Sequence, residues 1–250
     1  MKTELDVLPL LKRSVRWMGF AIVLFALFHL AGMTAREFTG EQRYFHKYAN
    51  LDEENNPATW FSTMGLGLCS LLAGVVWGGR KAQGDLGHRY WGGLAVIFLL
   101  MSLDEAASLH EFLVPRLQTF LPSEGHFRFT WVIPGLIFIG AFVAVYTRWW
   151  YRLPMPARNG FGLAGFAYCA GALGLEMVGG RLLDDVSRQS WAYGLSTGME
   201  ETLEMIGIFL VYRTLVQLLG AVEIHTALAP ASSAVAAEIS FTAARRMTSV

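Results

Sequence analysis

Six apolar stretches, each long enough to cross a bilayer as a helix, constrain the fold of this chain more than any other feature. A membrane-spanning helix needs roughly 20 consecutive apolar residues. Stretches of this kind lie at about 15–33, 58–79, 91–113, 130–150, 160–180 and 198–219. They leave only short connecting segments. The sequence therefore predicts an all-α fold, a polytopic transmembrane bundle of six helices that forms one domain over residues 1–220.

Composition excludes other broad classes of protein. Hydrophobic residues make up 54% of the chain, and its 20 Lys and Arg balance its 20 Asp and Glu. Without net positive charge, the chain lacks the electrostatic footprint of a nucleic-acid-binding protein. Its two cysteines, Cys69 and Cys169, both lie in apolar stretches, which argues against a disulfide-rich secreted scaffold. We expect the lipid bilayer, and no nucleic acid, as the main partner.

The distribution of positive charge predicts the orientation in the membrane. Lys and Arg concentrate in the N-terminal segment, the second and fourth loops and the C-terminal side. Positively charged loops remain cytoplasmic, so both termini are predicted to be cytoplasmic, in the inner membrane of a bacterium. The polar loop 34–57 is then expected to cap the outer, periplasmic face. Residues 221–250 are expected to form a disordered cytoplasmic tail.

Ionisable residues within the predicted spans carry the functional information, because an unpaired charge inside a bilayer costs several kcal/mol. In the predicted orientation these groups share one depth, in the outer half of the membrane. The candidate metal ligands are Asp104, Glu105, His110, Glu111, Glu176, Glu200, Glu201 and Glu204. His29 and Ser108 are candidates for supporting the ligands without binding the metal.

Helical geometry predicts which of these side chains face each other. The third-span acids and Ser108 share an arc of about 120°, and the three sixth-span acids share one of about 100°. His110 lies off the first arc and is expected to face a different neighbour. So many carboxylates at one depth need protons, water or a cation. A mixed carboxylate and imidazole shell suits one or two divalent ions of Zn, Mn or Fe.

These features favour a metal-dependent enzyme that acts on a lipid or another small membrane-soluble substrate. A water molecule activated by the metal is suited to hydrolysis, and iron would permit oxidation. Two alternatives stay open: a cation- or proton-coupled transporter, and an accessory subunit of a larger membrane complex. The inner halves of the spans carry almost no ionisable residue, which favours an outward-facing site over a path through the membrane.

Several candidate residues also have an ordinary structural interpretation. Thr197 and Glu200 fit a helix-capping box, in which acids of the first turn complement the helix dipole. Glu176 has Arg181 nearby in the sequence as an ion-pair partner. His29 is more typical of a hydrogen-bonded core histidine than of a metal ligand.

One combination of stretches carries a family resemblance. Ser102-Leu-Asp-Glu-Ala-Ala-Ser-Leu-His-Glu111 is followed by Glu176 and by Glu200-Glu-Thr-Leu-Glu204. This combination resembles a group of bacterial multi-span membrane proteins with an SLDEAxxxHE stretch and a later EExxE stretch. The resemblance covers the second to sixth spans and implies no established activity. Membrane-embedded CAAX-type proteases do not fit, because Glu200-Glu201 is followed by neither the Arg nor the two His-bearing helices of that family. Alkaline-ceramidase-like hydrolases need three zinc-binding histidines, and only His29 and His110 lie in the predicted spans.

Overall fold

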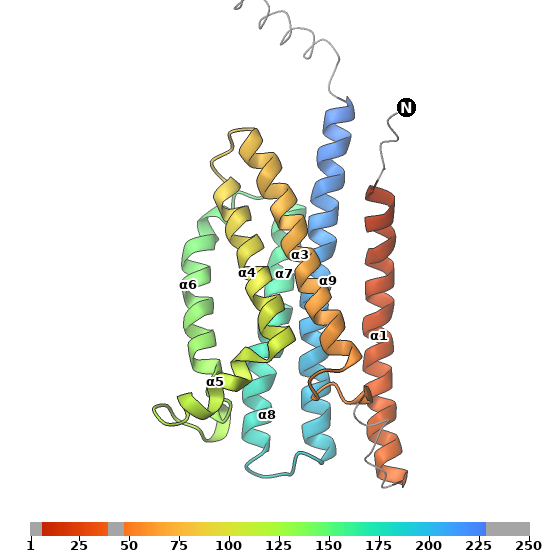
Figure 1. Cartoon of the computed structure of the whole chain (residues 1–250), viewed down its shortest axis with the longest axis vertical. Coiled ribbons are helices and arrows are strands. Elements are labelled where there is room, and N and C mark those ends of the chain that lie inside the picture. The colour runs from red at the N-terminus through yellow and green to blue at the C-terminus, as the bar shows by residue number, and fades with distance from the viewer. Residues whose placement is uncertain (1–6, 40–47, 229–250) are drawn as a thin grey trace, which may run out of the picture. The chain divides into compact units, whose positions relative to one another are not determined.

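The computed structural model describes residues 7–39 and 48–228, and all regular structure within these ranges is helical (Figure 1). Six segments are long and apolar enough to span a membrane. They are α1 (Leu8–Thr39), α3 (Pro57–Ala82), α4 (His88–Ala107), α6 (Val132–Trp150), α7 (Met155–Cys169) continued by α8 (Glu176–Leu182), and α9 (Trp191–Leu228). The short helix α5 (Leu109–Leu117) follows α4. The predicted all-α bundle of six transmembrane helices is confirmed.

Residues 1–216 form one compact unit, which contains every feature discussed below. Residues 217–250 form a second unit. Within the predicted tail, residues 221–228 continue α9 as helix, and residues 229–250 lie outside the described residues. Residues 40–47 of the predicted outer loop also lie outside them.

Helices α3 and α4 form an antiparallel pair joined by a tight turn. The turn contains Gly84, whose φ of 70° favours glycine. Two hydrogen bonds cross between the helices: Ser70 Oγ donates to the Ala95 carbonyl at 2.7 Å, and Ser102 Oγ to the Thr63 carbonyl at 2.8 Å. Such bonds help to hold helices together in lipid, where burial of apolar surface gives little driving force.

Helix α9 contacts helices from distant parts of the chain. The hydroxyl groups of Tyr212 and Ser14 of α1 lie 2.7 Å apart and share a hydrogen bond. Helix α9 also contacts α7, at Gly207. A Cβ added to this glycine would lie 2.7 Å from the Tyr168 Cβ and 3.0 Å from the Ala164 carbonyl oxygen. The absence of a side chain at this position therefore allows the two backbones to approach closely.

Two of the six spans are irregular. Helix α4 ends at Ala107 because Ser108 adopts a left-handed conformation with φ of 47°, and the chain restarts at once as α5. In the fifth span, a π-helical turn at Ala170–Leu175 separates α7 from α8. Turns of this kind are frequent at functional sites. The predicted spans 91–113 and 160–180 each contain an irregularity that apolar length does not reveal.

The crossing of α7 and α9 gives a test of the packing. We expect Gly207→Ala to destabilise the bundle by about 1–3 kcal/mol, because the new methyl group meets backbone atoms that cannot move independently. Gly140→Ala is the matched control, since nothing lies within 4 Å of a Cβ at that position. Thermal unfolding in detergent, followed by tryptophan fluorescence, should show a lower midpoint for Gly207→Ala only. Equal midpoints for the two variants would contradict the close crossing.

Candidate functional site

The irregular segments border a cavity of about 250 Å³ into which many acidic side chains are gathered. Nine acidic residues and one histidine line it, and among the described residues no Lys or Arg does so. These ten residues are Asp52, Glu54, Asp104, Glu105, His110, Glu111, Glu176, Glu200, Glu201 and Glu204. The structure thus brings all eight predicted ligand residues to one cavity and adds two acids from the loop before α3.

The helix break at Ser108 turns His110 into the cavity, whereas a continuous helix was expected to direct it elsewhere. Asp104 holds the restarted helix: its Oδ1 accepts the backbone N–H of His110 at 2.9 Å, and its Oδ2 lies 3.0 Å from the His110 Nδ1. The Trp131 ring packs beside the imidazole, with 5.0 Å between ring centroids. Position and ring orientation of His110 are therefore both fixed.

The charges around His110 favour its protonated form. Burial lowers the pKa of the imidazole, but the hydrogen bond and charge of Asp104, aided by Glu111 and Glu176, raise it to about 9. Because this value lies above the 6.5 of a free imidazole, the ion pair adds stability below pH 6.5. That contribution is lost as the pH rises through about 9.

The loop before α3 supplies Glu54, and Asn56 gives the loop its shape. The side-chain amide of Asn56 donates to the backbone carbonyls of Asn50 and Glu53, at 2.9 and 2.5 Å. Its oxygen accepts the backbone N–H of Thr59 at 2.8 Å, which caps the start of α3. The part of the predicted outer cap that the structure describes therefore contributes directly to the cavity.

His29 anchors the same loop from α1. Its Nδ1 accepts the backbone N–H of Leu51 at 3.1 Å, so Nε2 carries the proton and donates to the Gly194 carbonyl at 2.8 Å. His29 is buried and is not among the residues that line the cavity. These contacts fit the interpretation of a hydrogen-bonded core histidine that holds Asp52, the next residue of the loop, in place.

Both loop acids bind protons more readily than free carboxyl groups. Burial raises the pKa of Asp52 to about 6, against the opposing charge of Arg188 and the hydrogen bond from the Tyr193 hydroxyl at 3.2 Å. Burial also raises the pKa of Glu54, and the charge of Glu111 adds to this effect. Each group therefore takes up a proton at a higher pH than an exposed acid does.

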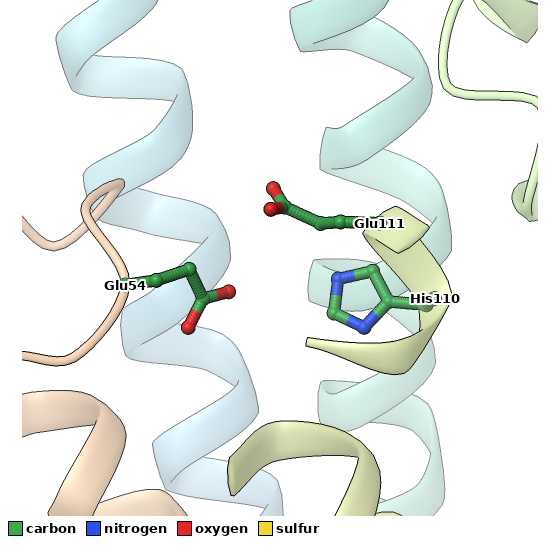
Figure 2. Close-up of side chains that lie close together, drawn as sticks. All are labelled: Glu54, His110 and Glu111. Atoms are coloured by element: carbon green, nitrogen blue, oxygen red, sulfur yellow. The ribbon is translucent and has the colours of Figure 1, made fainter. Parts of the chain in front are cut away.

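Three of the lining residues lie close enough together to share one ion. Ligand atoms of Glu54, His110 and Glu111 all lie within 4.8 Å of one another. Figure 2 shows Glu54 extending from the loop toward the two side chains of α5. Ser108 does not line the cavity, but its hydroxyl hydrogen-bonds to Glu54. It therefore contacts a candidate ligand without lining the cavity itself.

The sixth-span acids belong to the interior of a helix, which excludes the capping-box interpretation. Helix α9 begins at Trp191, more than two turns before Glu200. The side chain of Ser190 accepts the backbone N–H of Tyr193 at 3.2 Å at this start. Thr197 instead donates its hydroxyl to backbone carbonyls of the preceding turn.

Glu200 contacts the π-helical turn and Glu176. A Cβ on Gly171 would lie 2.7 Å from the Glu200 carbonyl oxygen, so the turn packs directly on α9. Glu176 hydrogen-bonds to Glu200 and accepts the Trp131 indole N–H at 2.8 Å. The second oxygen of Glu200, Oε2, is buried without a hydrogen-bond partner among the described residues. Arg181, the alternative partner of Glu176, forms ion pairs with Asp184 and Asp185.

The remaining acids complete the lining from two helices. Glu105 comes from α4, while Glu201 and Glu204 come from α9. The Tyr168 hydroxyl on α7 hydrogen-bonds to Glu204. Helices α4, α5, α7, α8 and α9 and the loop before α3 therefore direct ionisable side chains into a single space within the bundle.

Sequence reasoning missed four lining residues that contact this site. Asp52 and Glu54 had a signal, since they belong to the acidic run of the predicted outer loop. Trp131 and Tyr168 had none, because aromatic residues near the ends of membrane spans are common. Only the contact of Trp131 with Glu176 and that of Tyr168 with Glu204 reveal their part in the site.

The fold and the cavity define a polytopic helical membrane protein with an acidic cavity between its helices. Residues 17–218 match a family described as a domain of unknown function (DUF8692), and the chain belongs to that family. No curated protein and no solved structure matches it.

The contact between Asp104 and His110 makes a measurable prediction. In Asp104→Asn the pKa of His110 should fall from about 9 toward or below 6.5, because burial then acts with less opposition. Histidine-selective NMR across a pH titration measures this directly. Asp184→Asn, which alters an acid paired with Arg128 and Arg181, is the control and should leave His110 unchanged. An unchanged pKa in Asp104→Asn would show that other groups hold the proton.

Proposed function

We propose that the acidic cavity binds one or two divalent metal ions and that the protein is a metal-dependent enzyme acting on a lipid or another small membrane-soluble substrate. One observation carries this proposal: nine acidic side chains line one cavity, and no Lys or Arg of residues 7–39 and 48–228 lines it. Carboxylates held together in a low dielectric repel one another unless protons or cations neutralise them. A single histidine supplies too little positive charge for nine acids.

The first ion is assigned to Glu54, His110 and Glu111. Their ligand atoms come from a loop and a short helix and already lie within 4.8 Å of one another. Asp104 holds the Nδ1 side of the imidazole, which leaves Nε2 for a metal. A carboxylate that orients a metal-binding histidine in this way is a frequent partner in zinc sites. In this assignment Asp104 positions His110 instead of coordinating the ion.

The second ion is assigned to the deeper acids of α4, α8 and α9. The buried Oε2 of Glu200 lacks a partner among the described residues, and buried acceptors of this kind are rare unless water, a proton or an ion satisfies them. The hydrogen bond between Glu176 and Glu200 requires a proton on one carboxyl group, and a divalent ion can replace that proton. A shell of carboxylates and imidazole suits Zn, Mn or Fe.

We infer a bacterial inner-membrane location with both termini in the cytoplasm and the cavity open to the periplasmic side. The excess of Lys and Arg on the side of the termini supports this orientation. A substrate would then reach the acids from the periplasm or from the outer leaflet. The transporter alternative needs a polar path to the cytoplasm, and the apolar inner halves of the spans argue against one.

Metal content tests the proposal. Protein purified without chelator and incubated with Zn²⁺, Mn²⁺ or Fe²⁺ should retain one or two equivalents of ion by elemental mass spectrometry. Glu111→Gln should weaken binding by at least about tenfold, and Asp104→Asn by about 10- to 100-fold, the range expected when a partner of a metal-binding histidine is lost.

The control for these variants is Glu124→Gln, the same substitution at an acid outside the cavity lining. It should bind metal as the unmodified protein does. If the unmodified protein binds none of the three ions, the acids are neutralised by protons and the metal proposal fails.

A further inference from the structure

A second, apolar cavity of about 500 Å³ adjoins the acidic one. It lies among α3, α4, α6, α7 and α9, and in the part of the chain that the structure describes no Asp, Glu, His, Lys or Arg lines it. Five residues line both cavities: Met101, Phe138, Ile139, Tyr168 and Cys169. The acidic and apolar spaces are therefore separated by no more than a shared wall of side chains.

Three polar groups that line the apolar cavity have hydrogen-bond partners in the protein. The Tyr146 hydroxyl and the Trp150 indole N–H donate to backbone carbonyls at 3.2 and 2.9 Å, and the Thr147 hydroxyl donates to the carbonyl one turn earlier. Water enters a cavity when it finds several unsatisfied polar groups. Because these three groups are already hydrogen-bonded to backbone carbonyls, they are not available to bind water. The cavity therefore suits hydrocarbon.

The cavity is elongated along the helices. Its lining on α6 extends from Phe138 to Trp150, which is about 18 Å at 1.5 Å per residue. On α7 it extends from Phe161 to Cys169, the residue before the π-helical turn. The acidic cavity lies at the end marked by Phe138 and Cys169. An extended chain lying parallel to the helices thus has one end at the acids.

Tyr168 joins the two environments in one side chain. Its hydroxyl hydrogen-bonds to Glu204 in the acidic cavity, and the residue also lines the apolar cavity. A molecule that occupies both cavities and matches their linings must be polar at one end and apolar along the rest of its length.

We propose that the apolar cavity binds the hydrocarbon chain of the substrate and that the adjoining acidic cavity receives its polar head group. The substrate class is thereby an amphiphile with an extended hydrocarbon chain. The head-group part rests on the proposed function; the chain-binding part rests on the apolar cavity alone.

Photolabelling in lipid nanodiscs tests the chain site. The probe is dodecanol with a diazirine at the end of its chain, the competitor is unmodified dodecanol, and adducts are mapped by mass spectrometry. We expect adducts on residues of the apolar cavity such as Phe142 and Tyr146, which an excess of dodecanol removes. Labelling of outward-facing residues such as Leu71 should persist, because bulk lipid contacts do not saturate.

A matched pair of variants sharpens the test. Gly165 lines the apolar cavity, and nothing lies within 4 Å of a Cβ at that position. Gly165→Leu should therefore fill the cavity without a backbone clash and lower the saturable labelling at least tenfold. Gly74→Leu adds the same side chain where there is equal room but no cavity lining, and should label normally. Metal content should be unchanged in both variants.

The outcomes separate the two proposals. Labelling that dodecanol does not compete, in the unmodified protein, overturns the chain site whether or not the variants fold. Equal saturable labelling in Gly165→Leu and Gly74→Leu also overturns it. Saturable labelling in a protein that binds no metal supports the chain site and overturns the metal site alone.

Discussion

The repulsion between carboxyl groups gathered inside a membrane bundle is the constraint on which the rest of this structure depends. Nine acids share one cavity, and the protein offsets only part of the cost with its own groups. Asp104 pairs with His110, and the aromatic donors Trp131 and Tyr168 reach two of the deeper glutamates. The buried oxygen of Glu200 that lacks a described partner indicates that this compensation is incomplete.

Backbone irregularity is what brings these groups together. The left-handed Ser108 ends α4 and allows α5 to direct His110 and Glu111 toward Glu54. The π-helical turn packs on α9 at Gly171 and carries the chain into Glu176. If the helices continued without these breaks, the same side chains would point in other directions. In a continuous helix, the direction of each side chain is fixed by its position along the chain. The strain of a non-glycine residue at positive φ is therefore found where the site is built.

The two adjoining cavities separate acidic from apolar lining residues along the length of the helices. One is lined by nine acids and a histidine, and the other by apolar and aromatic side chains, among which the Tyr146 hydroxyl is paired with a backbone carbonyl. In the proposed function, charge and metal act on the head group while hydrocarbon is held by the spans.

The sequence by itself determined the six spans, the all-α class and seven of the nine acids that meet, because apolar length and ionisable residues within apolar segments are local properties. Tertiary structure alone decided the partners. Glu54 joins His110 across a helix break, and Trp131 reaches Glu176 from another span. Helix α9 begins at Trp191, so Glu200 became an interior residue instead of a cap. These outcomes depend on contacts between distant segments and on the left-handed conformation of Ser108, which breaks the helix. Periodicity along the chain encodes neither of them.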